Sequence, residues 1–369
     1  MLIFQHSIEQ QVVAHLAKRG IIIILGPRQS GKTTLAKKIL EPLGSEGAYF
    51  NCEHADVREH FVLGEPDALL SLIGAKKVVV FDEAQTIQNI GKILKVFYDT
   101  YPEKKIVATG SSAFDLANKI KEPLTGRAFE YILYPLSLEE VRTAMPVDRA
   151  HLEQLLLYGS YPAVVAEESP EGKLELLKNI ATNYLYKDIF TFEAIRNPKA
   201  LEDLIKHLSF RIGSTVSTHD LSKEIGITQV TVERYLRLLE QSFVVKRVYS
   251  FARNYANELK KSYKVYFLDN GVRNILSGAL HGLDDRERGT LFESYFLTEL
   301  LKRDALDTAP PDTFFWRTRD KKEIDFVRVR GKDIHAYECK WQDTSISFSL
   351  FKKHYPDARA EVVTPGMLL

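Results

Sequence analysis

The sequence feature that most constrains the fold is a glycine-containing loop between an apolar run and a helical pattern. Five aliphatic residues at 21–25 lead into GPRQSGKT at 26–33, and helical residues follow. The loop fits GxxxxGK[ST] in the context that this motif requires, a strand before it and a helix after it. Glycine lets the backbone curl so that several N–H groups face phosphate oxygens, and the helix start adds its positive dipole end. The loop therefore predicts a phosphate site on an α/β sheet.

Two side chains of this loop have specific predicted roles. Lys32 would reach the β- and γ-phosphates, and the Thr33 hydroxyl would bind Mg²⁺, so ATP and Mg²⁺ are the predicted cofactors. A chance glycine loop is the competing interpretation. The residues predicted to contact the nucleotide are Gly26, Pro27, Arg28, Gln29, Ser30, Gly31, Lys32, Thr33 and Thr34.

A second apolar run, at 77–81, ends in the adjacent carboxylates Asp82 and Glu83. Burying charge is costly, and a metal ion with an attacking water would justify it. Asp82 would hold Mg²⁺, and Glu83 would orient or activate the water. The alternative is a helix N-cap Asp followed by a first-turn Glu.

Two further positions extend the predicted site. The run at 106–109 ends in polar residues and could lie between the first two strands, where Ser111 would sense the γ-phosphate. Arg127 could complete a neighbour's site as an arginine finger. An ordinary strand-to-loop turn and a surface arginine are the respective alternatives. The predicted catalytic residues are Glu83, Lys32, Ser111 and Arg127.

The spacing of apolar runs predicts the architecture of the first 140 residues. The runs lie at 21–25, 48–52, 77–81, 106–109 and 129–133, and the segments between them are long enough for crossover helices. This pattern favours a mostly parallel sheet covered on both faces. Residues 150–195 are predicted to be helical.

Composition limits the function classes. Fifty basic and 49 acidic residues give a net charge of +1, so a polyanion-coating protein is excluded and any nucleic-acid contact must come from a local patch. No apolar run approaches the roughly 20 residues of a membrane span. Two cysteines cannot build a disulfide framework. A cytoplasmic protein without membrane contact is predicted.

The chain resembles the large prokaryotic family of AAA-type ATPases that carry a poorly characterised C-terminal half. The segments that carry the likeness are GPRQSGKTTL, VVVFDEAQ, ATGSSA and LTGRAFEYILYPLSLEE, then GSYP at 159–162, YKDI at 186–189 and KVYFLDNG at 264–271. The resemblance implies an ATP-binding core, a winged-helix module and a restriction-endonuclease-like C-terminal domain.

A helix–turn–helix pattern predicts a DNA-reading module in the middle of the chain. Residues 220–225 are helical in pattern, Gly226 suits the turn and Thr228 the cap of the second helix. The second helix has one apolar face, made of Val232, Leu236, Leu239 and Phe243. Six basic residues and one acidic residue between 246 and 264, interleaved with aromatics, suit a wing on DNA. The predicted DNA contacts are Gln229, Arg234, Arg237, Lys246, Arg247 and Arg253. Docking of proteins and an ATPase lid are the alternatives.

The C-terminal residues predict a hairpin with opposed carboxylates. Strand-like segments at 322–330 and 333–341 flank Gly331-Lys332, which suits a type II′ turn. That turn places Asp325 opposite Glu338, about 5 Å apart at Cβ, and like charges there need a bridging group. The motif resembles the PD-(D/E)xK nuclease superfamily, although no proline precedes Asp325.

The nuclease-like set is Glu293, Asp325, Glu338 and Lys340, with Asp325 and Glu338 as Mg²⁺ ligands. A simple ion pair between Glu323 and Lys340, or a nuclease-like fold that only binds DNA, are the alternatives.

These expectations combine into an α/β multidomain fold. The predicted domains are a P-loop AAA+ ATPase core at 1–145, a helical lid at 146–195, a winged helix at 196–265 and a nuclease-like domain at 266–369. The expected function is an ATP-hydrolysing protein that remodels or translocates on duplex or junction DNA, in recombination or repair by analogy, as a homo-oligomer such as a hexamer. An ATP-gated Mg²⁺-dependent endonuclease and a nucleotide-controlled signalling switch that binds protein partners stay open.

Overall fold

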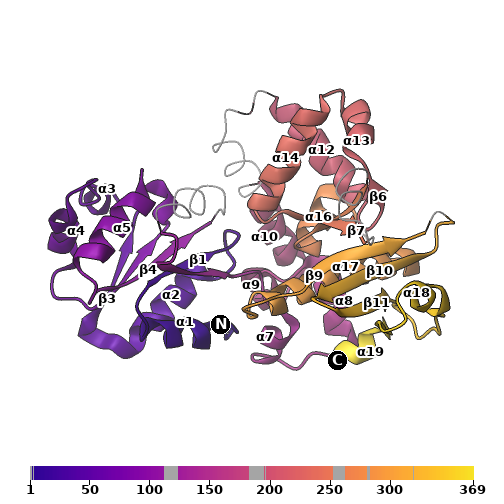
Figure 1. Ribbon diagram of the computed structural model, residues 1–369, viewed down its shortest axis with the longest axis horizontal. Coiled ribbons are helices and arrows are strands. Elements are labelled where there is room, and N and C mark those ends of the chain that lie inside the picture. The colour runs from indigo at the N-terminus through magenta and orange to yellow at the C-terminus, as the bar shows by residue number, and fades with distance from the viewer. Residues whose placement is uncertain are drawn as a thin grey trace. The chain divides into compact units, whose positions relative to one another are not determined.

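A computed structural model describes residues 2, 4–111, 124–182, 195, 197–251, 262–280, 283–318 and 320–369. The chain forms two compact units (Figure 1). The N-terminal unit comprises residues 2–136 and 241–243, and the C-terminal unit comprises residues 137–240 and 244–369. Among the described residues, no helix is both long and apolar enough to span a membrane.

The N-terminal unit contains a five-stranded sheet in the order β2-β3-β4-β1-β5, with all neighbours parallel. This confirms the predicted parallel sheet and the place of the third strand between the first two. Strands β1 and β3 are buried along their whole length, as expected for parallel strands covered on both faces. The strands are β1 (Ile21–Leu25), β2 (Gly47–Asn51), β3 (Val78–Asp82), β4 (Lys105–Gly110) and β5 (Ala128–Ile132).

Helices flank this sheet (Figure 1). The longest described one, α5, buries Ile90, Ile93, Leu94 and Phe97, an i, i+3, i+4, i+7 stripe. The helices are α1 (Glu9–Leu16), α2 (Lys32–Leu40), η1 (Glu41–Glu46), α3 (Ala55–Arg58), α4 (Pro66–Ile73), η2 (Ala84–Thr86) and α5 (Ile90–Thr100).

The C-terminal unit begins with helices, as predicted for residues 150–182; residues 183–194 lie outside the described part. These helices are α7 (Leu138–Arg142), α8 (Arg149–Tyr158), α9 (Pro162–Ala166), α10 (Pro170–Thr182), α12 (Pro198–Phe210), α13 (Thr218–Ile225) and α14 (Gln229–Gln241). Four more follow: α16 (Asn270–Ser277), α17 (Asp285–Asp304), α18 (Ser349–His354) and α19 (Pro365–Leu368).

A seven-stranded sheet in the order β12-β11-β10-β9-β7-β8-β6 completes this unit. Its strands are β6 (Thr215–Val216), β7 (Val245–Ser250), β8 (Tyr263–Phe267), β9 (Asp312–Arg317), β10 (Glu323–Arg330), β11 (Asp333–Cys339) and β12 (Arg359–Val363). Strands β7 and β9 pair in parallel, with Tyr249 beside Phe314. The sheet therefore continues across the predicted boundary at 265/266, and both predicted domains contribute strands to it.

Local turn chemistry agrees with the sequence at both motifs of this unit. Gly226 ends α13 with φ +74°, and the Thr228 hydroxyl accepts from the Thr231 N–H at 3.2 Å, so the predicted cap of α14 is confirmed. In the hairpin, Arg330 pairs with Asp333 and Gly331 has φ +61°, as the predicted register requires. One expectation was wrong: α14 ends at Gln241, so Phe243 does not belong to its apolar face.

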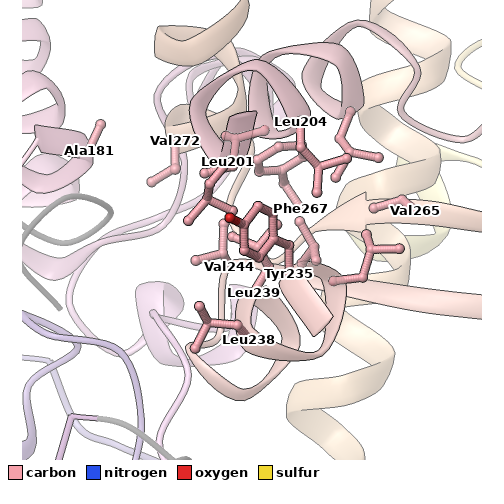
Figure 2. Packing of buried hydrophobic residues seen from close by; sticks show 14 of the residues in the cluster. Ala181, Leu201, Leu204, Tyr235, Leu238, Leu239, Val244, Val265, Phe267 and Val272 are labelled. Atoms are coloured by element: carbon pink, nitrogen blue, oxygen red, sulfur yellow. The ribbon is translucent and has the colours of Figure 1, made fainter. Parts of the chain in front are cut away.

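The core of the C-terminal unit joins α12, α14, β8 and α16 (Figure 2). Leu201, Leu204, Leu239 and Phe267 are fully buried in it. Tyr235 also lies in this cluster, and its hydroxyl donates to the Asn197 carbonyl at 3.2 Å, which satisfies a polar group that burial would otherwise penalise.

Buried contacts join two segments that carry the family resemblance, GSYP at 159–162 and the FLDNG end of KVYFLDNG at 264–271. The Asp269 carboxylate caps α16 by accepting from the Val272 N–H at 3.0 Å, and it accepts from the Ser160 N–H at 2.7 Å. A Cβ at Gly271 would lie 2.1 Å from the Tyr158 carbonyl oxygen. The GSYP and FLDNG segments therefore pack tightly against each other.

Candidate functional site: a phosphate loop and its carboxylates

The loop at 26–33 lies between β1 and α2, in the conformation that its glycines permit. Gln29 and Gly31 have φ of +61° and +103°, and α2 begins at Lys32 without a side-chain cap on its first turn. A Cβ at Gly26 would lie 2.1 Å from the Leu133 carbonyl oxygen, so the close approach of β5 requires glycine there. The loop thus leaves backbone N–H groups at a helix start for an anion.

Polar atoms of this loop fit a phosphate group. Lys32 is 4% exposed, and its ammonium donates to the carbonyls of Gly26 at 2.9 Å and Pro27 at 2.7 Å, so the side chain folds over the loop. Ser30 Oγ is buried and has no hydrogen-bond partner among the described residues. Of the other predicted contacts, Arg28 is partly buried, and Gln29 and Thr34 are exposed.

Asp82 lies at the end of β3, against the first turn of α2. The Thr33 hydroxyl donates to Asp82 Oδ2 at 2.7 Å, and the Tyr49 hydroxyl donates to the same oxygen at 2.5 Å. Thr109 at the end of β4 donates to Oδ1. Burial opposes ionisation of Asp82, but these hydrogen bonds outweigh it and hold its pKa below the usual value. Asp82 is therefore a carboxylate, as a Mg²⁺ ligand must be.

Glu83 follows in a left-handed conformation, φ +52°. Its backbone N–H faces Asp82 Oδ1 at 3.2 Å and Thr109 Oγ1 at 3.3 Å. Its carboxylate accepts from the Gln85 amide, which also donates to Ser111 Oγ at 3.1 Å. The structure thus brings Glu83 and Ser111 together through a third side chain.

Sequence reasoning missed Tyr49 and Gln85. Tyr49 lies in a correctly predicted strand, but nothing local marks its hydroxyl as a partner of Asp82, 33 residues away. Gln85 had a signal, because it follows the two carboxylates in the DEAQ segment at the end of a buried strand.

Arg127 forms a two-pronged ion pair within its own unit. Its guanidinium donates to the two carboxylate oxygens of Asp99 at 2.9 and 3.3 Å. This arrangement is what the surface-arginine alternative requires, and the arginine-finger role stays a prediction.

In the C-terminal unit, the predicted basic wing needs correction. Arg247 is not a DNA contact: its side chain is 5% exposed and pairs with Glu233 at 2.8 Å and Glu240 at 2.7 Å. Lys264, counted in the same stretch, is also buried. Lys246 is exposed, and Arg253 lies outside the described residues. Two of the three described cations of the stretch therefore neutralise internal carboxylates, because buried charge requires a partner.

Three predicted DNA contacts on α14 lie on its exposed side. Gln229 contacts His219 Nδ1 at 3.1 Å, and Arg237 pairs with Glu233 at 3.0 Å while 70% of its side chain stays exposed. Arg234 is exposed and lies beside the ring of Tyr235.

Two carboxylates of the nuclease-like set, Glu293 and Asp325, lie beside a buried lysine together with Glu323. Lys264 Nζ lies 2.6 Å from Glu323, 3.1 Å from Glu293 and 3.9 Å from Asp325. Burial, together with Glu293 and the neighbouring Glu338, raises the pKa of Asp325 well above its usual value. An internal ammonium thus lies beside Asp325, one of the two acids that the sequence assigned to a metal site.

Lys340 donates to Glu338 at 2.8 Å, while Glu323 pairs with Lys264, so the alternative ion pair between Glu323 and Lys340 was wrong. In the part of the chain that the structure describes, no group of three or more His, Cys, Asp or Glu residues is arranged to hold a metal ion. The roles of Asp325 and Glu338 as Mg²⁺ ligands stay predictions.

In comparison with known proteins, family models match three successive segments of the chain. Residues 18–142 match a family model described as an AAA domain. Residues 149–286 and 288–368 match two models described as domains of unknown function. An uncharacterized protein of Mycobacterium tuberculosis is 27% identical, covering 99% of this chain and 81% of its own length. Another, of Haemophilus influenzae, is 27% identical, covering 90% of this chain and 85% of its own.

Solved structures give distant matches. The Thermotoga maritima RuvB Holliday junction branch migration motor is 14% identical, with 66% of this chain and 90% of that chain covered and a TM-score of 0.33. DnaA from Aquifex aeolicus is 13% identical, with 63% and 86% covered and a TM-score of 0.33. The match over residues 18–142, together with the loop and its carboxylates, supports an AAA-type ATPase domain in this part of the chain.

Proposed function

We propose that the chain hydrolyses ATP at the 26–33 loop and uses this turnover to remodel or translocate on duplex or branched DNA. The observation that carries the proposal is the 2.7 Å contact between Thr33 and Asp82. It joins a hydroxyl and an ionised carboxylate from two separate motifs, which is the pair that a Mg²⁺–nucleotide complex requires.

Each side chain has a role that its position supports. Lys32 and the loop N–H groups would bind the phosphates, while Thr33 and Asp82 would hold Mg²⁺. Bound Mg²⁺ would neutralise charge on the β- and γ-phosphates. Glu83 would accept a proton from the attacking water, because Asp82 is already engaged by three hydroxyl donors.

Replacing Thr33 by Ala tests the metal part of the proposal. We expect the Mg²⁺ concentration for half-maximal phosphate release to rise at least about tenfold, because one oxygen ligand is lost. Thr33→Ser keeps the hydroxyl and should stay near the wild type. Thr100→Ala, which removes an exposed hydroxyl at the end of α5, is the matched control. An unchanged Mg²⁺ dependence in Thr33→Ala would contradict the assignment.

The DNA part of the proposal rests on α14 and the elements around it. The order α12, β6, α13, α14, β7, β8, with β8 between β6 and β7, supports the proposal of a winged-helix module. In such modules the second helix of the turn motif enters a groove. Gln229, Arg234 and Arg237 line the exposed side of α14, which supports contact of this helix with DNA.

Arg234→Ala with Arg237→Ala tests this surface. We expect the double variant to bind duplex and four-way-junction DNA about tenfold more weakly, with a shallower salt dependence, because phosphate contacts are lost. The measurement is a gel-shift panel with and without ATP. Arg359→Ala removes an exposed arginine from β12 and serves as the control. Equal affinity of the double variant and the wild type would argue for a protein partner, the signalling alternative.

A homo-oligomer, with Arg127 acting on a neighbouring site, remains part of the proposal. The endonuclease alternative has less support, because Lys264 lies 3.9 Å from Asp325, one of the two carboxylates that would have to bind metal.

A further inference from the structure

We propose that Gln85 is a positioning residue for ATP hydrolysis, which links the water-activating Glu83 to the strand end at Ser111. The inference rests on the proposed function and deepens it. Gln85 lies in η2, two residues after Glu83, and is only 7% exposed. Its side chain is therefore held inside the site rather than at the surface.

Gln85 bridges Glu83 and Ser111, and hydrogen-bonding chemistry fixes the orientation of its amide group. A carboxylate oxygen can only accept hydrogen bonds, so the nitrogen of the Gln85 amide must face Glu83 Oε2. The same nitrogen lies 3.1 Å from Ser111 Oγ. A primary amide nitrogen carries two hydrogens, and one can serve each acceptor. Gln85 thus holds Glu83 and Ser111 with two donors of one rigid, planar group.

The two hydrogen bonds of Gln85 leave different roles for the remaining polar atoms of Glu83 and Ser111. Because Glu83 Oε2 is engaged by Gln85, Oε1 is the oxygen that we assign to the attacking water. Because Ser111 Oγ accepts from Gln85, its own O–H points to a different acceptor, and the γ-phosphate is the acceptor that we assign.

Gln85 then transmits the position of the phosphate, sensed at the end of β4, to the carboxylate that acts on the water. A displacement of about 1 Å in such a group is enough to slow a reaction about 100-fold.

The backbone supports the same assignment. Glu83 has φ +52°, an uncommon conformation for a residue with a side chain, and Thr109 and Asp82 accept from its N–H. This leaves the Glu83 side chain anchored at its backbone end by β4 and at its carboxylate end by Gln85. The first anchor, Thr109, belongs to β4, and the second, Gln85, is itself bonded to Ser111, the residue that directly follows β4.

The test is steady-state ATP turnover, with nucleotide affinity measured separately by fluorescent-nucleotide binding. Gln85→Leu keeps the volume and removes both donors, and Gln85→Glu keeps the shape and removes them too. We expect kcat to fall about 10–100-fold in each, with nucleotide affinity within about threefold of the wild type. Ser111→Ala should slow turnover as well, and Gln85→Leu with Ser111→Ala should be much less harmful than the product of the single effects.

Glu83→Gln and thermal melting separate the possible outcomes. No turnover by the wild type would remove the proposed function and this inference with it. Turnover that requires Glu83 but proceeds at the wild-type rate in Gln85→Leu would overturn this inference alone. So would strictly multiplicative effects of Gln85 and Ser111, or a loss confined to nucleotide affinity. If Gln85→Leu melts early, Gln85→Glu and the Ser111 comparison decide the question.

Discussion

Glu83→Gln is expected to lower kcat for ATP hydrolysis about 100–1,000-fold and to leave nucleotide binding nearly unchanged. The amide has the shape of the carboxylate but cannot accept a proton from water, so the loss falls on the chemical step. Asp82 cannot substitute, because hydroxyls of Thr33, Tyr49 and Thr109 engage its oxygens and it is assigned to the metal.

Phosphate release and fluorescent-nucleotide binding measure the two quantities for Glu83→Gln. Glu130→Gln, an exposed carboxylate on β5 of the same unit, is the matched control. A Glu83→Gln protein that hydrolyses ATP at close to the wild-type rate would show that Glu83 is not the group that accepts the proton from water.

Lys264→Met is expected to lower the free energy of unfolding of the C-terminal unit by about 3–5 kcal/mol. Methionine fills a similar volume, but buried Asp325 and the partly buried Glu293 and Glu323 would be left without this cation. Both tryptophans, Trp316 and Trp341, lie in this unit, so urea unfolding followed by tryptophan fluorescence reports on it alone. Lys332→Met, in the exposed hairpin turn, is the control.

Acidification should reduce the loss of stability that Lys264→Met causes. The pKa of Asp325 is already raised in the folded chain, by burial first and then by Glu293 and Glu338. A raised pKa means that the folded state binds the proton more tightly than the unfolded state, so stability rises as pH falls. Removing Lys264 raises the pKa of Asp325 further, because this lysine favours the ionised carboxylate. The difference in unfolding free energy between the wild type and Lys264→Met should therefore become smaller from about pH 8 to about pH 5.5. A difference that is constant with pH would indicate lost packing rather than lost charge balance.

The phosphate site could be predicted in large part because its signals are local. The 26–33 loop, the run before Asp82 and the polar end of β4 each carry their pattern within a few residues. Since parallel strands end at one edge of a sheet, three such ends predict one site. The bridge through Gln85 could not be placed in the same way, because it depends on the direction of a side chain from a short 3₁₀ turn.

The basic stretch shows why charge counts along a chain can mislead. Alternation along β7 places Lys246 outside and Arg247 inside, and the partners of Arg247 lie 7 and 14 residues earlier, on α14. A count over residues 246–264 omits those acids. Lys264 likewise meets Glu293 and Glu323, 29 and 59 residues later. A buried cation and its partners become visible only when the sheet is assembled.

The pairing of β7 with β9 has a consequence for work with fragments. The two family models of the C-terminal unit meet at residues 286–288, but Tyr249 and Ser250 pair with Phe314 and Phe315 across that point. A fragment ending there would keep β7 and β8 but lose β9, so β7 would present bare backbone donors and acceptors along an aromatic edge, which favours aggregation. Expression of residues 137–369 in one piece preserves that edge in its paired state.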